Sequence, residues 1–131
     1  MNAEQSVPGP DAESGPASEP VLDPEDAKII TLARSARARN RTPEGAAVRD
    51  ATGRTYAAVS VALPSLKLSA LEVAVAMAVS SGAERLEAAA IVSEADGLTA
   101  SVVAAALDLK AGAVFLAAPD GSVVAVQRRA S

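Results

Sequence analysis

The chain contains no cysteine and no histidine. It therefore forms no disulfide and lacks the two side chains that most often bind zinc. Aromatic residues are almost absent too, because only Tyr56 and Phe115 are present to stack against a ligand. No apolar run reaches the ~18 residues of a membrane span, and the first residues lack the features of a secretory signal. We therefore expect a cytoplasmic protein that is not embedded in a membrane.

The residues that are present are mainly small and apolar, with 50% of the chain hydrophobic. All of the net charge of −4 lies in residues 1–22, which hold four acidic residues, four prolines and no lysine or arginine. Such a segment has little apolar surface to bury, so we expect a disordered acidic tail. Residues 23–131 are expected to form one domain. Its 12 basic and 12 acidic residues (16 − 4) balance, which argues against general binding of nucleic acid.

Local signals predict where the helices and strands of this domain lie. Asp23 and Pro24 are suited to begin a helix that extends to residue 40, and Gly82 is suited to end a second helix over 66–81. A third helix is expected over 98–109. Strands are expected over 45–50, 54–61, 86–93, 113–118 and 122–127. This alternation predicts an α/β fold, a three-layer α/β/α sandwich with a five-stranded mixed sheet.

The second and third predicted helices are apolar on more than one side. Helices of this kind are usually buried on both sides. In a domain of this size, the second side is expected to be covered by another subunit. We therefore predict a homo-oligomer, a dimer or a tetramer.

Four segments, in order, resemble the cytidine deaminase family. Gly45–Val48 followed by Gly53–Tyr56 is similar to the family's "VGAAL…DGRIYTG" hairpin, and Ala76–Gly82 is similar to its "LFKAVSEG" helix end. Ala90–Ser93 with Asp96-Gly97 is similar to "AVVSDSDG", and Val114–Ala117 with Asp120-Gly121 is similar to "VILANLDG". The resemblance covers roughly residues 27–126 and implies the cytidine deaminase fold.

The resemblance also implies where a catalytic zinc site would lie. Family members hold zinc through a "C/H-A-E" motif and a "P-C-x-x-C" motif, and the glutamate moves protons. Here the three ligand positions are Ser69, Ser101 and Ala104, and the proton-shuttle position is Leu71. Neutral serine is a poor zinc ligand and alanine is none, so no metal or other cofactor is expected. The adjacent Glu72 is interpreted as a helix-surface glutamate.

The positions that would bind nucleoside differ in the same way. The family's "N-x-E" ribose clamp aligns with Ser60-Val61-Ala62, so Ser60 and Ala62 mark only a vestigial nucleoside pocket. We therefore interpret the chain as a catalytically inactive, cytidine deaminase-like homo-oligomeric structural or interaction module, that is, a pseudoenzyme. Two alternatives remain open. One is a nucleoside-binding sensor without turnover, and the other is a zinc-dependent cytidine deaminase, as fold similarity alone would assign.

A cluster of basic residues is left over from these assignments: Arg34, Arg37, Arg39 and Arg41. Basic residues near a helix C-terminus complement the helix dipole, and this structural interpretation is favoured. The alternative is an interaction patch for a phosphate, RNA or an acidic protein partner whose identity the sequence does not give.

Overall fold

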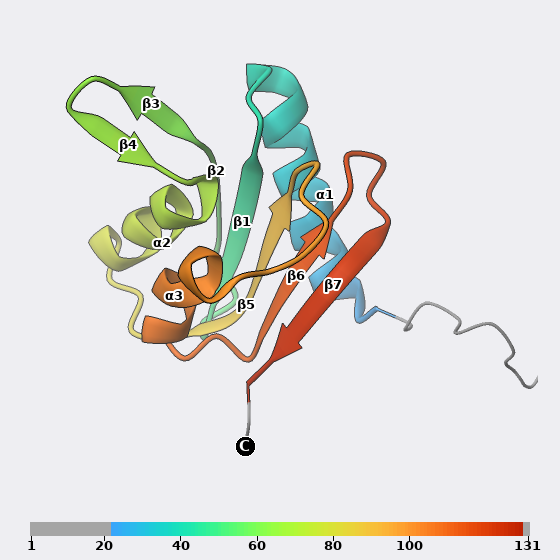
Figure 1. Ribbon diagram of the computed structural model, residues 1–131. Helices are drawn as coiled ribbons and strands as arrows, with labels where there is room; N and C mark the ends of the chain where they lie inside the picture. The colour runs from blue at the N-terminus through green and yellow to red at the C-terminus, as the bar shows by residue number, and fades with distance from the viewer. Residues whose placement is uncertain (1–21, 130–131) are drawn as a thin grey trace, which may run out of the picture.

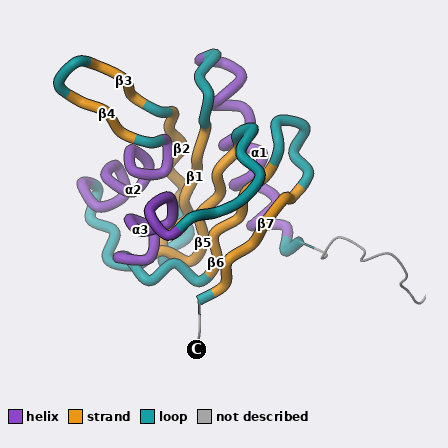
Figure 2. Tube along the Cα trace, viewed as in Figure 1, coloured by secondary structure: helices purple, strands orange, loops and turns teal. Residues whose placement is uncertain are grey.

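A computed structural model of the chain describes residues 22–129, which form a three-layer α/β/α sandwich (Figures 1 and 2). In chain order the elements are α1 (Pro24–Asn40), β1 (Gly45–Asp50), β2 (Thr55–Val59), β3 (Val61–Leu63), β4 (Leu66–Leu68), α2 (Ala70–Ser80), β5 (Leu86–Val92), α3 (Ala100–Asp108), β6 (Ala113–Ala117) and β7 (Val123–Arg128). The predicted acidic tail, residues 1–22, lies outside the described residues except for Leu22.

The main sheet has five strands in the order β2-β1-β5-β6-β7. Only β5 and β6 are parallel, and α3 makes the crossover between them, while the other neighbours are antiparallel. The prediction of a five-stranded mixed sheet in an α/β/α sandwich is therefore confirmed.

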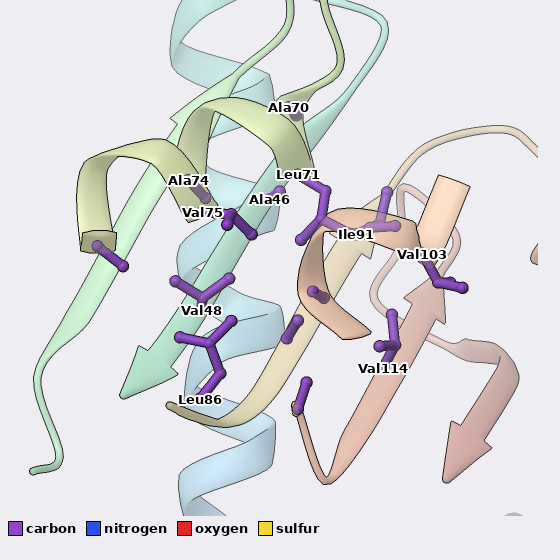
Figure 3. Packing of buried hydrophobic residues seen from close by; sticks show 14 of the residues in the cluster. Ala46, Val48, Ala70, Leu71, Ala74, Val75, Leu86, Ile91, Val103 and Val114 are labelled. Carbon is purple, nitrogen blue, oxygen red and sulfur yellow. The ribbon is translucent and has the colours of Figure 1, made fainter. Parts of the chain in front are cut away.

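Helices cover both faces of this sheet, so the domain has two hydrophobic cores. Helix α1 packs on one face, where Ile29 and Phe115 are fully buried. Helices α2 and α3 pack on the other face, around Leu71, Val103 and Val114 (Figure 3). Strands β1 and β6 are buried along their whole length, and β5 is buried except at Glu87, which explains the largely apolar sequences of β5 and β6.

The prediction for residues 54–81 is partly wrong. The predicted 54–61 strand ends at Val59, and the predicted 66–81 helix begins only at Ala70. Between them, β3 and β4 pair as a separate two-stranded hairpin that projects beyond the main sheet (Figure 1). Leu66 and Leu68 are spaced as in a strand, whereas Leu68 and Leu71 are spaced as in a helix, so the apolar pattern alone does not separate the two.

A buried arginine ties α1 to the sheet. The Arg49 guanidinium donates through Nη2 to Asp26 Oδ1 at 3.0 Å and through Nε to Glu87 Oε1 at 2.9 Å. Burial alone would lower the pKa of Arg49, but the hydrogen bonds and charges of these two carboxylates outweigh it and raise that pKa. Arg49 is therefore charged at every physiological pH and fixes the start of α1 against β1 and β5.

The turn between β1 and β2 depends on Asp50. Its Oδ1 accepts hydrogen bonds from the Thr52 N–H at 2.9 Å, the Thr52 hydroxyl at 2.7 Å and the Arg54 N–H at 3.0 Å. Burial raises the pKa of Asp50, but these hydrogen bonds outweigh it and leave the pKa below its ordinary value. The ionised carboxylate therefore stabilises the folded state.

We expect Asp50→Asn to lower the free energy of unfolding by about 1 kcal/mol at pH 7. The loss is no larger because Asp50 lines a hollow in which solvent weakens charge-assisted hydrogen bonds. Because the folded-state pKa is depressed, this contribution is present above the unfolded pKa of about 3.9 and is lost as pH falls through the folded value. Urea unfolding of both proteins at pH 7 and at pH 3 measures it. If the two proteins differed in free energy of unfolding by the same amount at both pH values, the ionised Asp50 carboxylate would not be the source of the stabilisation.

Candidate functional site

The first part of the site is the N-terminus of α2, where Ser69 is the N-cap. The Ser69 Oγ accepts the Glu72 N–H at 3.1 Å, and Glu72 Oε1 accepts the Ser69 N–H at 2.8 Å. This reciprocal pair is a capping box. Glu72 is thus an exposed glutamate, as predicted, but one that fixes the helix start together with the Ser69 hydroxyl.

A second carboxylate, which the sequence did not point to, reaches the same helix end. Glu44 Oε1 accepts the Ala70 N–H at 3.0 Å from a position 26 residues earlier in the chain. Helix N-termini favour negative charge because their first N–H groups lack partners within the helix. The N–H groups of Ser69, Ala70 and Glu72 are therefore all bonded to side chains of this chain itself.

Leu71 lies in the hydrophobic core. Its side chain is 1% exposed and belongs to the cluster that α2 and α3 form with the sheet. In Figure 3 it lies between the two helices, close to Ile91. This position is therefore filled by an apolar side chain that packs the two helices together.

The two candidate positions on α3 lie on its outer side. Ser101 is exposed, and its hydroxyl lies 3.3 Å from the Thr99 hydroxyl, whose oxygen caps the helix. Ala104 is exposed as well, whereas Val103 and Ala106 face the core. Of the predicted site positions, Leu71 is therefore in the core, whereas Ser101 and Ala104 are exposed.

The vestigial clamp residues lie at the projecting hairpin. Ser60 is half-buried between β2 and β3, and Ala62 is exposed on β3, where it pairs with Lys67 of β4. A hollow lies beside Glu44, and neither Ser60 nor Ala62 lines it.

That hollow has a volume of about 330 Å³ and follows the carboxyl end of β5, where open α/β sheets commonly bind ligands. It is lined by Arg37, Pro43, Glu44, Ser93, Glu94 and Ala95. Arg37 is already engaged, because its Nε donates to the Pro43 carbonyl at 3.1 Å and its Nη2 lies 3.8 Å from Glu94. Three of the six lining residues are charged and none is aromatic, so the hollow offers charge but no stacking surface.

The arginine cluster divides into two pairs. Arg34 and Arg37 tie α1 to neighbouring loops, since Arg34 Nε donates to the Pro119 carbonyl at 2.9 Å and Arg37 bonds to Pro43. Arg39 and Arg41 are exposed at the end of the helix, and the Arg41 N–H caps it by bonding to the Arg37 carbonyl. These contacts support the structural interpretation for Arg34 and Arg37.

The donor groups of this region do not fit a zinc site. Zinc in proteins is bound by cysteine, histidine and carboxylate side chains, and the first two do not occur in this chain. Over residues 22–129, no group of three or more aspartates and glutamates could hold a metal ion. The carboxylates nearest to α2, Glu44 and Glu72, accept backbone N–H groups instead.

The fold agrees with a family model and with two solved structures. Residues 22–121 match the family model described as cytidine deaminase-like, and the chain belongs to this family. It is similar to the crystal structure of cytidine deaminase from Burkholderia pseudomallei, with TM-score 0.65 and 23% identity over 77% of this chain and 90% of the other. It is also similar to cytidine deaminase from Mycobacterium leprae, with TM-score 0.61 and 22% identity over 81% and 94%.

A search of curated protein sequences found no match. At these identities, the two structures establish the shared fold and nothing about activity. Within residues 22–129, none of the helices combines the length and the apolar character needed to cross a membrane.

Proposed function

We propose that this protein is a catalytically inactive member of the cytidine deaminase-like family. The observation that carries the proposal is the burial of Leu71, at the position where the family pattern has the proton-shuttle glutamate. Hydrolytic deamination by this family uses a zinc-activated water together with that glutamate. Here a core leucine replaces the acid, and neither cysteine nor histidine is available to bind the metal.

The residues at this site have structural tasks that support the proposal. Ser69 caps α2, Glu44 bonds to the next N–H, and Leu71 joins α2 and α3. A cavity lined by unpaired polar groups would cost roughly 1–3 kcal/mol for each group. Filling and capping the site therefore stabilises a domain that does not carry out the reaction.

We further propose that the domain acts as a homo-oligomeric module. Its α2 and α3 layer exposes large apolar side chains, among them Met77, Val79 and Leu107. Exposed apolar side chains that gather on one side of a domain mark an interaction surface. The proposed role as an interaction module is therefore supported by this exposed apolar surface and not by a catalytic site.

A second candidate function is nucleoside binding without turnover. The observation that favours it is the hollow of about 330 Å³ at the carboxyl end of β5, which is at the lower end of the size of ligand sites. The lack of aromatic rings in its lining weighs against it. A thermal-shift series with pyrimidine and purine nucleosides tests it, because a ligand that binds only the folded state must raise the melting temperature.

Purified protein is expected to contain no stoichiometric zinc and to release neither uridine nor ammonia from cytidine. Elemental analysis of protein prepared without chelators, followed by a deamination assay with added zinc, checks both expectations. An active cytidine deaminase processed in parallel serves as the control. One zinc per chain, or turnover that depends on zinc, would overturn the proposed function.

A further inference from the structure

A second hollow, with a volume of about 320 Å³, lies where β1 ends beside the start of β5. Asp50, the last residue of β1, pairs there with Leu86, which Figure 3 labels on β5. The hollow beside Glu44 follows the other end of β5. The seven residues of this strand, at about 3.3 Å each, therefore separate the two hollows. We call the hollow at Asp50 the turn hollow.

Backbone hydrogen bonds join the two segments that line the turn hollow. The Ala51 N–H donates to the Arg85 carbonyl at 3.0 Å, and the Asp50 N–H donates to the Arg54 carbonyl at 2.8 Å. The Asp50 carboxylate, which is 3% exposed, holds the turn in shape through its Oδ1. The positions of Arg54 and Arg85 are therefore fixed before a ligand arrives, which lowers the entropic cost of binding.

Three exposed charged side chains line the turn hollow, those of Arg54, Glu84 and Arg85. The ion pairs among residues 22–129 are formed by two other arginines. Within that part of the chain, Arg54, Glu84 and Arg85 are therefore left without a charged partner. By contrast, the one arginine beside Glu44 is already engaged by a carbonyl and a carboxylate.

The buried Asp50 carboxylate still has capacity to accept a hydrogen bond. Its Oδ1 accepts three short ones, but the bond to its Oδ2 comes from the Tyr56 hydroxyl at 3.5 Å, the upper limit for such a bond. A buried carboxylate oxygen without a good donor is unfavourable. A positively charged donor in the turn hollow would improve this arrangement.

We propose that the turn hollow binds a small zwitterion of the size of an α-amino acid. Its lining carries two positive and two negative side chains, those of Arg54, Arg85, Asp50 and Glu84. The planar guanidinium groups match a carboxylate, and the two acidic groups match an ammonium. A simple anion or a simple cation would satisfy one pair and be repelled by the other, whereas a zwitterion satisfies both.

The remaining lining leaves room for a small aliphatic side chain on the ligand. The volume is at the lower end of the range for ligand sites, as a compound of this size requires. The uncharged lining residues are all small: Ala51, Thr52, Gly82 and Ala83. This site is independent of the proposed function, because it uses none of the residues at the start of α2 or on α3.

The first test separates the two charges of the ligand. The full chain is titrated with L-valine and, at matched ionic strength, with isovalerate and isobutylamine, which lack the ammonium and the carboxylate respectively. L-Valine is expected to shift the amide NMR signals of Thr52 and Gly82. Each half-ligand should bind at least about tenfold more weakly, since it loses charged hydrogen bonds. Equal binding of L-valine and isovalerate would overturn the proposal of a zwitterion.

The second test changes one charge of the site at a time. Arg85→Gln is expected to weaken L-valine binding at least about tenfold. Glu84→Gln should also weaken L-valine binding but strengthen that of isovalerate, because it removes a negative charge that repels the carboxylate. The matched control is Arg39→Gln, the same substitution at an exposed arginine on α1, and it should leave binding unchanged. Thermal melts verify that each variant folds.

The contrary outcomes are distinct from failure of the proposed function. If L-valine shifts neither Thr52 nor Gly82 at millimolar concentration, or shifts only Ser93 and Glu94 in the other hollow, the proposed site is wrong. If Arg39→Gln weakens binding as much as Arg85→Gln does, the effect is one of overall charge and the site is again wrong. None of these results alters the zinc and deamination measurements, which test catalysis alone.

Discussion

Replacing Leu71 by glutamate is expected to lower the free energy of unfolding by about 4 kcal/mol or more. The side chain is 1% exposed and packs α2 against α3 and the sheet. The substitution removes apolar contacts, which typically contribute 2–5 kcal/mol for a buried leucine, and places a carboxyl group without partners in the core. Urea unfolding followed by circular dichroism measures the loss. This substitution restores the glutamate that the family pattern has at this position. The loss in free energy of unfolding therefore tests whether a pocket that accepts a carboxylate is still present there.

The control is Leu71→Met, which keeps the volume and is expected to cost less than about 1.5 kcal/mol. The difference in free energy of unfolding between the wild type and Leu71→Glu should also shrink as pH falls. Burial raises the pKa of the introduced carboxyl group above that of an unfolded glutamate, so its penalty is largest at high pH and is relieved on protonation. If Leu71→Glu cost less than about 1 kcal/mol at pH 7, the side chain would reach a solvated pocket. The proposal of a filled site would then be wrong.

Gly45→Ala is expected to cost more than about 3 kcal/mol, because α1 crosses β1 at this residue without room for a side chain. A Cβ atom at Gly45 would overlap the Ala33 carbonyl oxygen and lie 2.9 Å from the Arg37 Cβ. Both contacts are with α1, and one is with its backbone, so the helix itself has to move away from the sheet. The same helix holds Arg37 beside the polar hollow, so the displacement would alter that region too.

Gly97→Ala provides the matched control. A Cβ atom there meets nothing within 4 Å, and the residue does not have a positive φ angle. The substitution is expected to be neutral or to stabilise by about 0.4–1 kcal/mol, because it restricts the unfolded chain. Unfolding curves for both variants measure the difference. Equal stability of Gly45→Ala and Gly97→Ala would show that α1 tolerates displacement from β1.

Much of the fold could be predicted from local signals along the chain. The layers and the mixed sheet were predicted correctly from the helix cap at Asp23, the turn at Gly53 and the apolar strands. The region around residues 61–69 was assigned wrongly because its apolar spacing suits both a strand and a helix. The Ser69-x-x-Glu72 capping signature was present in the sequence and marks the true start of α2.

The candidate site was only partly predictable. The sequence located Ser69 and Leu71 at the start of α2, but it gave no sign that Glu44 bonds there. Nor did it show that Ser101 and Ala104 lie on the outer side of α3. The direction in which a side chain points depends on how the helix is rotated against the sheet, and packing sets that rotation.

The sequence by itself determined which chemistry is available, because side chains that do not occur in a chain cannot bind a metal in any fold. It also determined the order of helices and strands through caps, turns and apolar periods, which are local properties. Only the tertiary structure decided that Leu71 is core, that Glu44 reaches α2, and that the leucines of the hairpin share one exposed face. These features join residues far apart in the chain or depend on strand register, so they arise only when the layers pack together.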